Sequence, residues 1–372
     1  MENTWHFPPL QEIRVRFRRH FLAIQQIYPA SRFQTKVISP DAQDEIAWIE
    51  ADPLAERKKL LIISVGQHGI EGYFGFEVLD QFIREFLHKI DPRDTGLLII
   101  SPINPWGMRN LRKVDADSVD LNRNFINPQE WAALPKGNLY PAISRLVTPE
   151  KPVANLAMEE LKLFARLIYY LLKLGRPAIM RGALQGQYFQ PGQIYYGGSQ
   201  PQAPARLLME LFQQHCPQYE KVLHIDMHTG YGPRDRMSVV CSPFDPRTST
   251  EIGAWLGYPD VVKTSPGEFY EIHGDMVDYQ YQHVFSQMSG KDCFAATFEF
   301  GTYGDSALAG VRSLFTMVIE NQNYWHGSVD ADTAAEVKHR FVELYYPSDP
   351  AWKKRALENA RRAWKGVLTA FR

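Results

Sequence analysis

The chain has 372 residues, 45% of them hydrophobic, and its 41 basic and 42 acidic residues give a formal net charge of −1. This balance gives no electrostatic reason to expect nucleic acid or an anionic membrane as a partner, so binding specificity has to come from a local site. Three cysteines without Cys-x-x-Cys spacing argue against a disulfide framework and against a thiolate zinc site.

The beginning of the chain lacks the apolar stretch and small-residue cleavage site of a secretory signal, so we predict a cytoplasmic protein. The longest apolar segment, 161–174, contains Lys162, Arg166 and Lys173 and is shorter than the roughly 20 residues that span a bilayer. We expect this segment to form a helix packed on the body of the protein, and we expect no membrane partner.

The first predicted elements are a helix, two strands and a second helix. Residues 10–28 carry apolar side chains at helical spacing, which predicts a helix that covers a sheet. Strands are predicted over 37–47 and 60–65, and the second lacks polar alternation, as expected for a strand covered on both faces. A helix over 74–90 follows, because apolar residues recur there every three or four positions.

The loop between the second strand and this helix, from Gly66 to Gly72, contains His68 and Glu71. Such a loop lies at the carboxyl end of a sheet, where open α/β folds bind ligands. The His-x-x-Glu spacing lets an imidazole nitrogen and a carboxylate oxygen converge on a metal, but a catalytic zinc needs a third protein ligand. Without one, the simpler interpretation is that His68 bonds a backbone carbonyl and Glu71 lies near a helix start, favoured by the dipole.

A strand predicted over 97–103 also ends in a polar region. It leads into a turn, Asn104-Pro-Trp-Gly107, and then into a stretch with too few apolar residues to form a regular element. This stretch contains Arg109, Arg112 and Arg123. They belong either to a solvated surface loop or to an anion site, in which a guanidinium group binds a carboxylate or a developing oxyanion.

Two later strands carry polar residues close to their ends. Residues 222–230 are largely apolar, but His224, Asp226 and His228 share one face by the period of two. Residues 294–301 are largely apolar as well, and Glu299 lies near their end. A carboxylate in such a strand needs a partner or a function.

The remaining sequence is mostly helical. Helices are predicted over 155–174, 308–322 and 333–345, and an amphipathic tail follows, without a second sheet or a linker. We therefore predict an α/β fold with a mixed, largely parallel central sheet flanked by helices. It forms a single domain over 1–372, with a catalytic core of about 35–325 and a helical C-terminal extension of about 326–372.

The order of these motifs resembles that of the zinc carboxypeptidase-type metallopeptidases. The shared elements, over about 60–305, are the His-x-x-Glu pair, the Asn-Pro-x-Gly turn, Asp120-Leu-Asn-Arg-Asn-Phe125, a later Asp-x-His-Thr and a Thr-Phe-Glu strand. Ordered agreement of this kind is more specific than any single motif. Gly186-Gln-Tyr and Tyr196-Gly-Gly further resemble an uncharacterised, mainly bacterial branch of that family, and the chain is more distantly similar to succinylglutamate desuccinylase and aspartoacylase.

The resemblance implies a metal centre and the groups that act beside it. By this resemblance, the ligands of one zinc ion per chain are His68, Glu71 and His228. Water would hold the fourth position, and Glu299 matches the general base that takes its proton. Arg112 is the match for the arginine that polarises the scissile carbonyl, with Arg109 as the rival choice.

The resemblance also implies how the substrate is held. Asn122 and Arg123 match the pair that grips a substrate carboxylate, and Asp226 would orient a metal ligand from behind or take part in a second metal site. The mobile active-site tyrosine of the family has no motif that locates it in this sequence. The candidates are Tyr258, Tyr270 and Tyr281.

The implied function is zinc-dependent hydrolysis of an amide bond next to a free carboxylate, with a small peptide or an acyl-amino acid as substrate. The alternatives are an N-acyl amino acid deacylase and a catalytically inactive binding protein of the same fold. The deacylase branch typically adds a β-rich C-terminal module, so helices after Glu299 favour the peptidase-like branch. A serine hydrolase and a nucleotide-binding protein are disfavoured because no Gly-x-Ser-x-Gly, Gly-x-Gly-x-x-Gly or P-loop motif occurs.

Overall fold

A computed structural model describes residues 7–39, 44–134, 139–265 and 272–372. Its strands form one sheet in the order β1-β2-β4-β3-β5-β8-β6-β7, in which the central β4, β3, β5 and β8 are parallel. Antiparallel pairs flank this centre on both sides. This confirms the predicted mixed sheet with helices around it. The strands are β1 (Arg32–Val37), β2 (Glu45–Ala51), β3 (Lys59–Val65), β4 (Thr95–Ile100), β5 (Lys221–Thr229), β6 (Met237–Cys241), β7 (Val261–Lys263) and β8 (Asp292–Phe300).

The uniformly apolar sequence of β3 is explained by two apolar layers, one on each face of the sheet. Leu61 and Ile63 belong to a cluster that includes residues of α1, α2, α8 and α12, whereas Leu60 and Ile62 belong to a second cluster with α7 and α9. Successive side chains of a strand point to opposite faces, so a strand that is covered twice has no polar side. These helices are α1 (Leu10–Gln25), α2 (Gly72–Glu85), α7 (Ala203–His215), α8 (Ser249–Leu256), α9 (Met276–Tyr279) and α12 (Pro350–Ala370).

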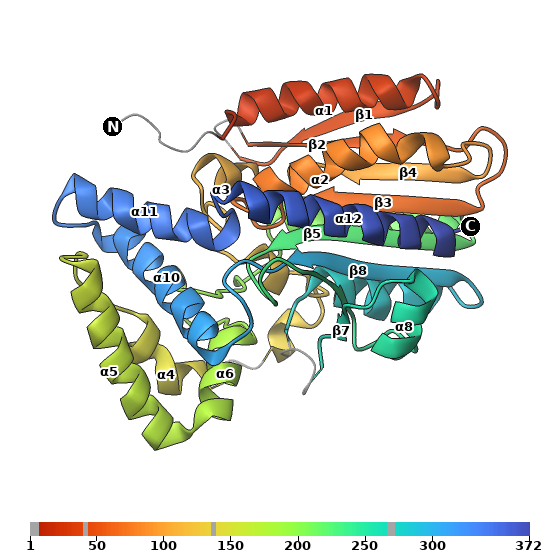
Figure 1. Cartoon of the computed structure of the whole chain (residues 1–372). Coiled ribbons are helices and arrows are strands. Elements are labelled where there is room, and N and C mark those ends of the chain that lie inside the picture. The colour runs from red at the N-terminus through yellow and green to blue at the C-terminus, as the bar shows by residue number, and fades with distance from the viewer. Residues whose placement is uncertain (1–6, 40–43, 135–138, 266–271) are drawn as a thin grey trace.

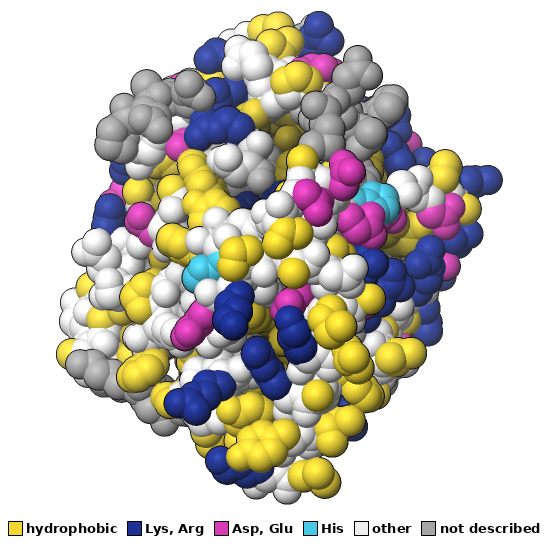
Figure 2. Space-filling model, turned by 90° about the vertical axis from the view of Figure 1, so that its left-hand side faces the viewer, with side chains coloured by type: hydrophobic (Ala, Val, Ile, Leu, Met, Phe, Trp, Pro, Cys, Tyr) yellow, Lys and Arg dark blue, Asp and Glu magenta, His cyan; other side chains and the backbone are white. Residues whose placement is uncertain are grey.

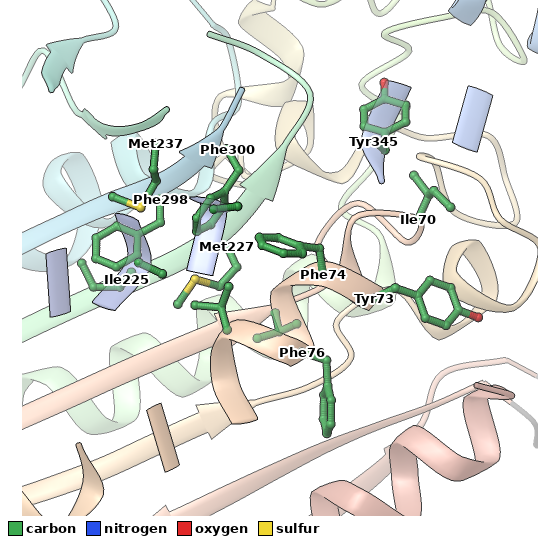
Figure 3. Close-up of a cluster of buried hydrophobic side chains, with 14 of the residues drawn as sticks. Ile70, Tyr73, Phe74, Phe76, Ile225, Met227, Met237, Phe298, Phe300 and Tyr345 are labelled. Carbon is green, nitrogen blue, oxygen red and sulfur yellow. The ribbon is translucent and has the colours of Figure 1, made fainter. Parts of the chain in front are cut away.

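The core next to the site consists of aromatic and sulfur-containing side chains from α2 and the central strands. Phe74 packs edge-on against Phe300, with ring centroids 4.9 Å apart, and both are buried. Figure 3 shows these rings together with Met227 and Phe298 between helix and sheet. Packing of this kind holds α2, and the loop that precedes it, against the ends of β5 and β8.

Two predicted boundaries in the N-terminal half are wrong. The segment predicted as one strand over 37–47 belongs to two antiparallel strands: β1 ends at Val37, β2 begins at Glu45, and the Ile38 N–H donates to the Asp44 carbonyl at 2.8 Å. The turn at Asn104 begins a short helix, α3 (Pro105–Arg109). The Asn104 side chain caps it by accepting from the Gly107 N–H at 2.8 Å, and Pro105 suits the first helical position.

The helices predicted after β8 are confirmed as α10 (Ala307–His326), α11 (Ala331–Tyr345) and α12. The last helix folds back onto α2, where the buried Trp364 lies 4.6 Å from Phe82 between ring centroids. In the described part of the chain, no helix is long and apolar enough to cross a membrane.

A group of helices lies beyond the carboxyl ends of the central strands, at the left of Figure 1. We call this group the helical lobe. It contains α10 and α11 together with α4 (Tyr140–Val147), α5 (Leu156–Leu174) and α6 (Arg176–Leu184). The lobe therefore lies over the edge of the sheet at which the sequence predicts a ligand site.

Candidate metal centre

The loop after β3 is fixed by a second loop that runs beside it. The Gly69 N–H donates to the Lys113 carbonyl at 3.1 Å, and the Ile70 N–H donates to the Arg112 carbonyl at 3.0 Å. A side chain at Gly69 would meet the backbone of Gly107 at 2.1 Å, so only glycine permits this approach. The two loops thereby hold His68 and Lys113 next to each other.

The structure brings His68, Glu71 and His228 to one point. The Nδ1 atom of His68 lies 2.8 Å from Glu71 Oε1 and 3.1 Å from His228 Nδ1, which is itself 3.1 Å from Glu71 Oε2. Ligands about 2.1 Å from a tetrahedral zinc ion are separated by roughly 3.4 Å. The three side chains are buried and could hold a metal ion after shifts of a few tenths of an ångström.

The far nitrogen of each histidine is held by a buried carboxylate. His68 Nε2 lies 2.9 Å from Asp120 Oδ1, and His228 Nε2 lies 2.5 Å from Asp226 Oδ2. A ring that donates from Nε2 to its carboxylate presents the Nδ1 lone pair to the shared point, which is the tautomer of a metal ligand. The donor set therefore has a geometry that suits a divalent metal.

Behind Asp226 the polar contacts continue into the sheet. Its other oxygen accepts a hydrogen bond from Ser64 Oγ at 2.5 Å, and Ser64 contacts His224 Nε2 at 2.7 Å. His224 Nδ1 in turn lies 2.7 Å from Gln280 Oε1. His224 thus supports the site from behind, although it shares a strand face with His228.

Glu299 is placed beside the three ligands by strand pairing. In the parallel register of β5 and β8 it is the direct partner of His228, and its carboxylate accepts from the Tyr231 N–H at 3.0 Å. Burial and the neighbouring charge of Glu71 raise the pKa of Glu299 to about 8. Burial also acts to raise the pKa of Glu71, but His68 and His228 outweigh it and bring that pKa to about 2.

The two arginines expected at the substrate carbonyl lie elsewhere. Arg112 is buried against Glu320, with Nε 3.1 Å from Oε1, and its guanidinium stacks 3.7 Å from the centroid of Tyr324. Arg109 pairs with Asp44 at 3.0 Å. Neither lines the cavity described below.

The cation beside the three ligands is Lys113, which the sequence reasoning passed over. Its Nζ lies 3.0 Å from His68 Nε2 and also pairs with Asp120. Its position next to Arg112 was the only hint in the sequence. The contact between the two loops decides which of the two cations reaches the site: the Lys113 side chain turns toward the cavity, and the Arg112 side chain turns toward α10.

Asn122 and Arg123 do line the cavity, on a 3-10 turn capped by Asp120. The Asn122 amide donates to Asp275 at 2.9 Å and accepts from Gln67 at 3.0 Å. Arg123 donates to the Leu184 carbonyl of α6 at 2.8 Å, so it connects the site to the helical lobe. Both side chains are therefore held in one orientation.

Gln67 and Tyr231 are further site residues that the sequence reasoning missed. Gln67 is fully buried and accepts from His228 Nε2 at 3.0 Å, while Tyr231 is 40% exposed and lines the cavity. Each stands within three residues of a proposed ligand, which is the signal that could have found them. Of the tyrosines considered from the sequence, Tyr258 and Tyr281 are buried on other partners, and Tyr270 lies outside the described residues.

The site opens into a cavity of about 350 Å³. The sheet supplies its polar end, and the helical lobe supplies an apolar wall on the other side. The residues of this wall include Leu167, Leu171, Ile179, Leu184, Val311, Leu314 and Met317.

A family model described as "Protein of unknown function (DUF2817)" matches residues 44–359. No curated protein matches the chain in sequence. Among solved structures, bovine thrombin-activatable fibrinolysis inhibitor bound to a tick carboxypeptidase inhibitor matches with 12% identity and a TM-score of 0.48, over 89% of this chain and 97% of that one.

Two further solved structures are similar at this level. Carboxypeptidase A from Helicoverpa armigera matches with 10% identity and a TM-score of 0.46, over 91% of this chain and 74% of that one. An aspartoacylase family protein from Mesorhizobium loti matches with 12% identity and a TM-score of 0.37, over 81% and 68%. At identities this low, the chemistry of the site has to be inferred from the side chains of this chain and not from these structures.

Proposed function

The chain belongs to the family of proteins of unknown function designated DUF2817, and we propose that it is a zinc-dependent hydrolase of an amide bond next to a free carboxylate. The observation that carries this proposal is the convergence of His68, Glu71 and His228, with each imidazole tied through Nε2 to a buried carboxylate. Two histidines and a glutamate are a donor set of catalytic zinc in hydrolases.

A zinc ion on these ligands would act as a Lewis acid and lower the pKa of a bound water to about 7. Glu299 is the base that takes a proton from the attacking water and later gives it to the departing amine. One cause of its raised pKa is the charge of Glu71. Neutralisation of that charge by a bound cation favours the carboxylate form that a base needs.

Lys113 takes the role that the resemblance gave to an arginine. Its ammonium group lies beside His68, lines the cavity and is held by Asp120. A fixed cation at this place stabilises the negative charge that develops on the carbonyl oxygen during attack.

Arg123 and Asn122 are proposed to bind the carboxylate of the substrate. Arg123 is buried at the cavity wall and is oriented by the Leu184 carbonyl, so its charge is held in place rather than solvated. A carboxylate bound here would set the distance from the substrate's charged end to the scissile bond. That distance would restrict cleavage to an amide near a free carboxylate.

An N-acyl amino acid deacylase is a second candidate, favoured by the apolar wall of the cavity. Leu167 and Leu171 of α5 and Val311 and Leu314 of α10 line a space that suits an acyl chain as well as an apolar peptide. Both substrate classes carry the carboxylate that Arg123 would bind. They differ in the group on the other side of the amide.

The test combines metal content with substrate capping. Wild type and Glu299→Gln should each hold about one zinc ion per chain by plasma mass spectrometry, His68→Ala should hold almost none, and the surface variant His88→Ala serves as control. Wild type should cleave blocked dipeptides or N-acyl amino acids but not their carboxyl-terminal amides, and Glu299→Gln should lose about 10²- to 10⁴-fold in turnover. Absence of metal from wild type after zinc is added back would overturn the proposal.

A further inference from the structure

The helix α5 exposes apolar side chains on the face that points away from the protein. The described part of the chain has 20 large hydrophobic side chains that are exposed, and seven of them lie on this one helix. Leu172 is 85% exposed and Leu161 is 61% exposed, while Leu163 and Leu167 on the opposite face are buried. The segment was expected to pack on the body of the protein, but only one side of it does. The seven residues are Met158, Leu161, Phe164, Ile168, Tyr169, Leu171 and Leu172.

Basic residues are interspersed with these apolar side chains. Residues 161–181, which run from α5 into α6, contain five lysines and arginines and no aspartate or glutamate. Lys162 pairs with Glu159 at 2.7 Å, and no ion pair of the other four is found among the described residues. The five are Lys162, Arg166, Lys173, Arg176 and Arg181. The net charge of the whole chain hides this local excess.

The two kinds of side chain share one surface. Figure 2 faces the helical lobe, and in the lower part of this view hydrophobic and basic side chains alternate, whereas acidic side chains lie higher up. In Figure 1 the lower part of the lobe contains α5 and α6, with α4 between them. An apolar patch within positive charge is unusual on a monomeric protein and marks an interaction surface.

We propose that the α5–α6 hairpin docks on a lipid surface that carries anionic headgroups. The apolar side chains would enter the boundary between headgroups and acyl chains, and the five basic side chains would contact the phosphates. This combination requires both an apolar and a negatively charged partner. A second copy of the same hairpin fits less well, because two like-charged faces would repel each other.

The hairpin also lies next to the cavity, although docking does not depend on the proposed activity. Its inner faces contribute the buried Leu167 of α5 and Ile179 of α6 to the cavity wall, and the cavity is also lined by Leu171 and Met180, which are 38% and 40% exposed. A docked hairpin would therefore hold the apolar wall of the cavity close to the lipid surface. Vesicle binding and metal content are separate readouts, so failure of one proposal is distinguishable from failure of the other.

The experiment is co-sedimentation of the full chain with phosphatidylcholine vesicles, with and without phosphatidylglycerol. Wild type should bind the anionic vesicles at least about tenfold more tightly than the neutral ones. The charge-reversed variant is Arg166→Glu, Lys173→Glu and Arg181→Glu, none of which lines the cavity, and its matched control is Lys89→Glu, Lys354→Glu and Lys365→Glu. We expect about a tenfold or greater loss of binding for the first and little change for the second.

The apolar contribution is tested by Leu161→Ser with Leu172→Ser, against Leu22→Ser with Leu54→Ser, which are exposed elsewhere. The first pair should weaken vesicle binding about tenfold or more with an unchanged circular dichroism spectrum, and the second should not. Unchanged sedimentation of the first pair, or equal binding to neutral vesicles, would overturn the proposal. A dimer in solution that the first pair abolishes would overturn it in favour of a second copy of the chain.

Discussion

At the carboxyl end of the sheet, buried polar groups are paired with one another, whereas on the outer face of α5 the described protein leaves apolar side chains exposed. His68 and His228 each contact a carboxylate with the ring nitrogen that points away from the shared point. Leu161 and Leu172, by contrast, are more than half exposed. In the first region the protein itself supplies partners for the buried polar groups. In the second region it leaves apolar side chains exposed, and an external partner could cover them.

This difference separates residues that serve the fold from residues that serve an external partner. Arg112 and Lys113 show the same contrast between adjacent positions. Arg112 is neutralised inside the protein by Glu320, while Lys113 lines the cavity beside His68. Both are cations in one loop, but only Lys113 meets the space where a substrate would lie.

The largest effects are expected from substitutions at these two positions. Arg112→Met leaves the buried Glu320 with Lys338, 3.0 Å away, as its remaining ion pair among the described residues, so the free energy of unfolding should fall by about 3 kcal/mol or more in urea titration. Lys113→Met should lower kcat by about 10²- to 10³-fold with the metal retained. Lys113→Arg should restore part of the rate. The reverse pattern, with the rate lost at Arg112 and kept at Lys113, would contradict the assignment.

These two positions also show what a sequence can and cannot predict. The motifs around His68, Glu71, His228 and Glu299 were readable because each lies at the end of an apolar strand, and parallel strands bring their carboxyl ends to one edge. The choice between Arg112 and Lys113 depends on hydrogen bonds between two loops that are about 45 residues apart in sequence. Side-chain direction in an irregular loop follows no period, so no local pattern predicts it.

In the helical lobe, α5, α10 and α11 were predicted as helices, but α4 and α6 were not, and the sequence did not show which face of α5 would be exposed. The apolar spacing of 155–174 gave the helix, which the structure has as Leu156–Leu174, yet it could not show that only Leu163, Leu167 and their neighbours find a covering layer. The break between β1 and β2 within 37–47 was missed although Ser39-Pro40-Asp41 is a turn signal in the sequence. Which face of a helix or strand becomes covered depends on packing against residues far away in the sequence, so the local pattern does not predict it.

A smaller effect is expected from the carboxylates that hold the two histidines. Asp226→Asn removes the charge that fixes the His228 ring through Nε2, so metal affinity should fall by about 10- to 100-fold while Glu71 and His68 remain in place. Competition with a zinc-chelating dye measures this change. Asp245→Asn is the control, since Asp245 is equally buried but pairs with Arg247. Equal losses in both variants would mean that the effect is on stability and that Asp226 does not position His228.

The smallest effect is expected on the outer face of α5. Leu172→Ala should change the free energy of unfolding by no more than about 0.5 kcal/mol, because an 85% exposed side chain loses almost no packing when it is shortened. Leu163→Ala, on the same helix but 1% exposed, should cost about 2 to 5 kcal/mol through the cavity that it leaves. Urea titration of both variants compares the two faces directly. A large cost at Leu172 would show that the isolated chain already covers this side chain, and the surface would then have nothing apolar left to offer to a lipid.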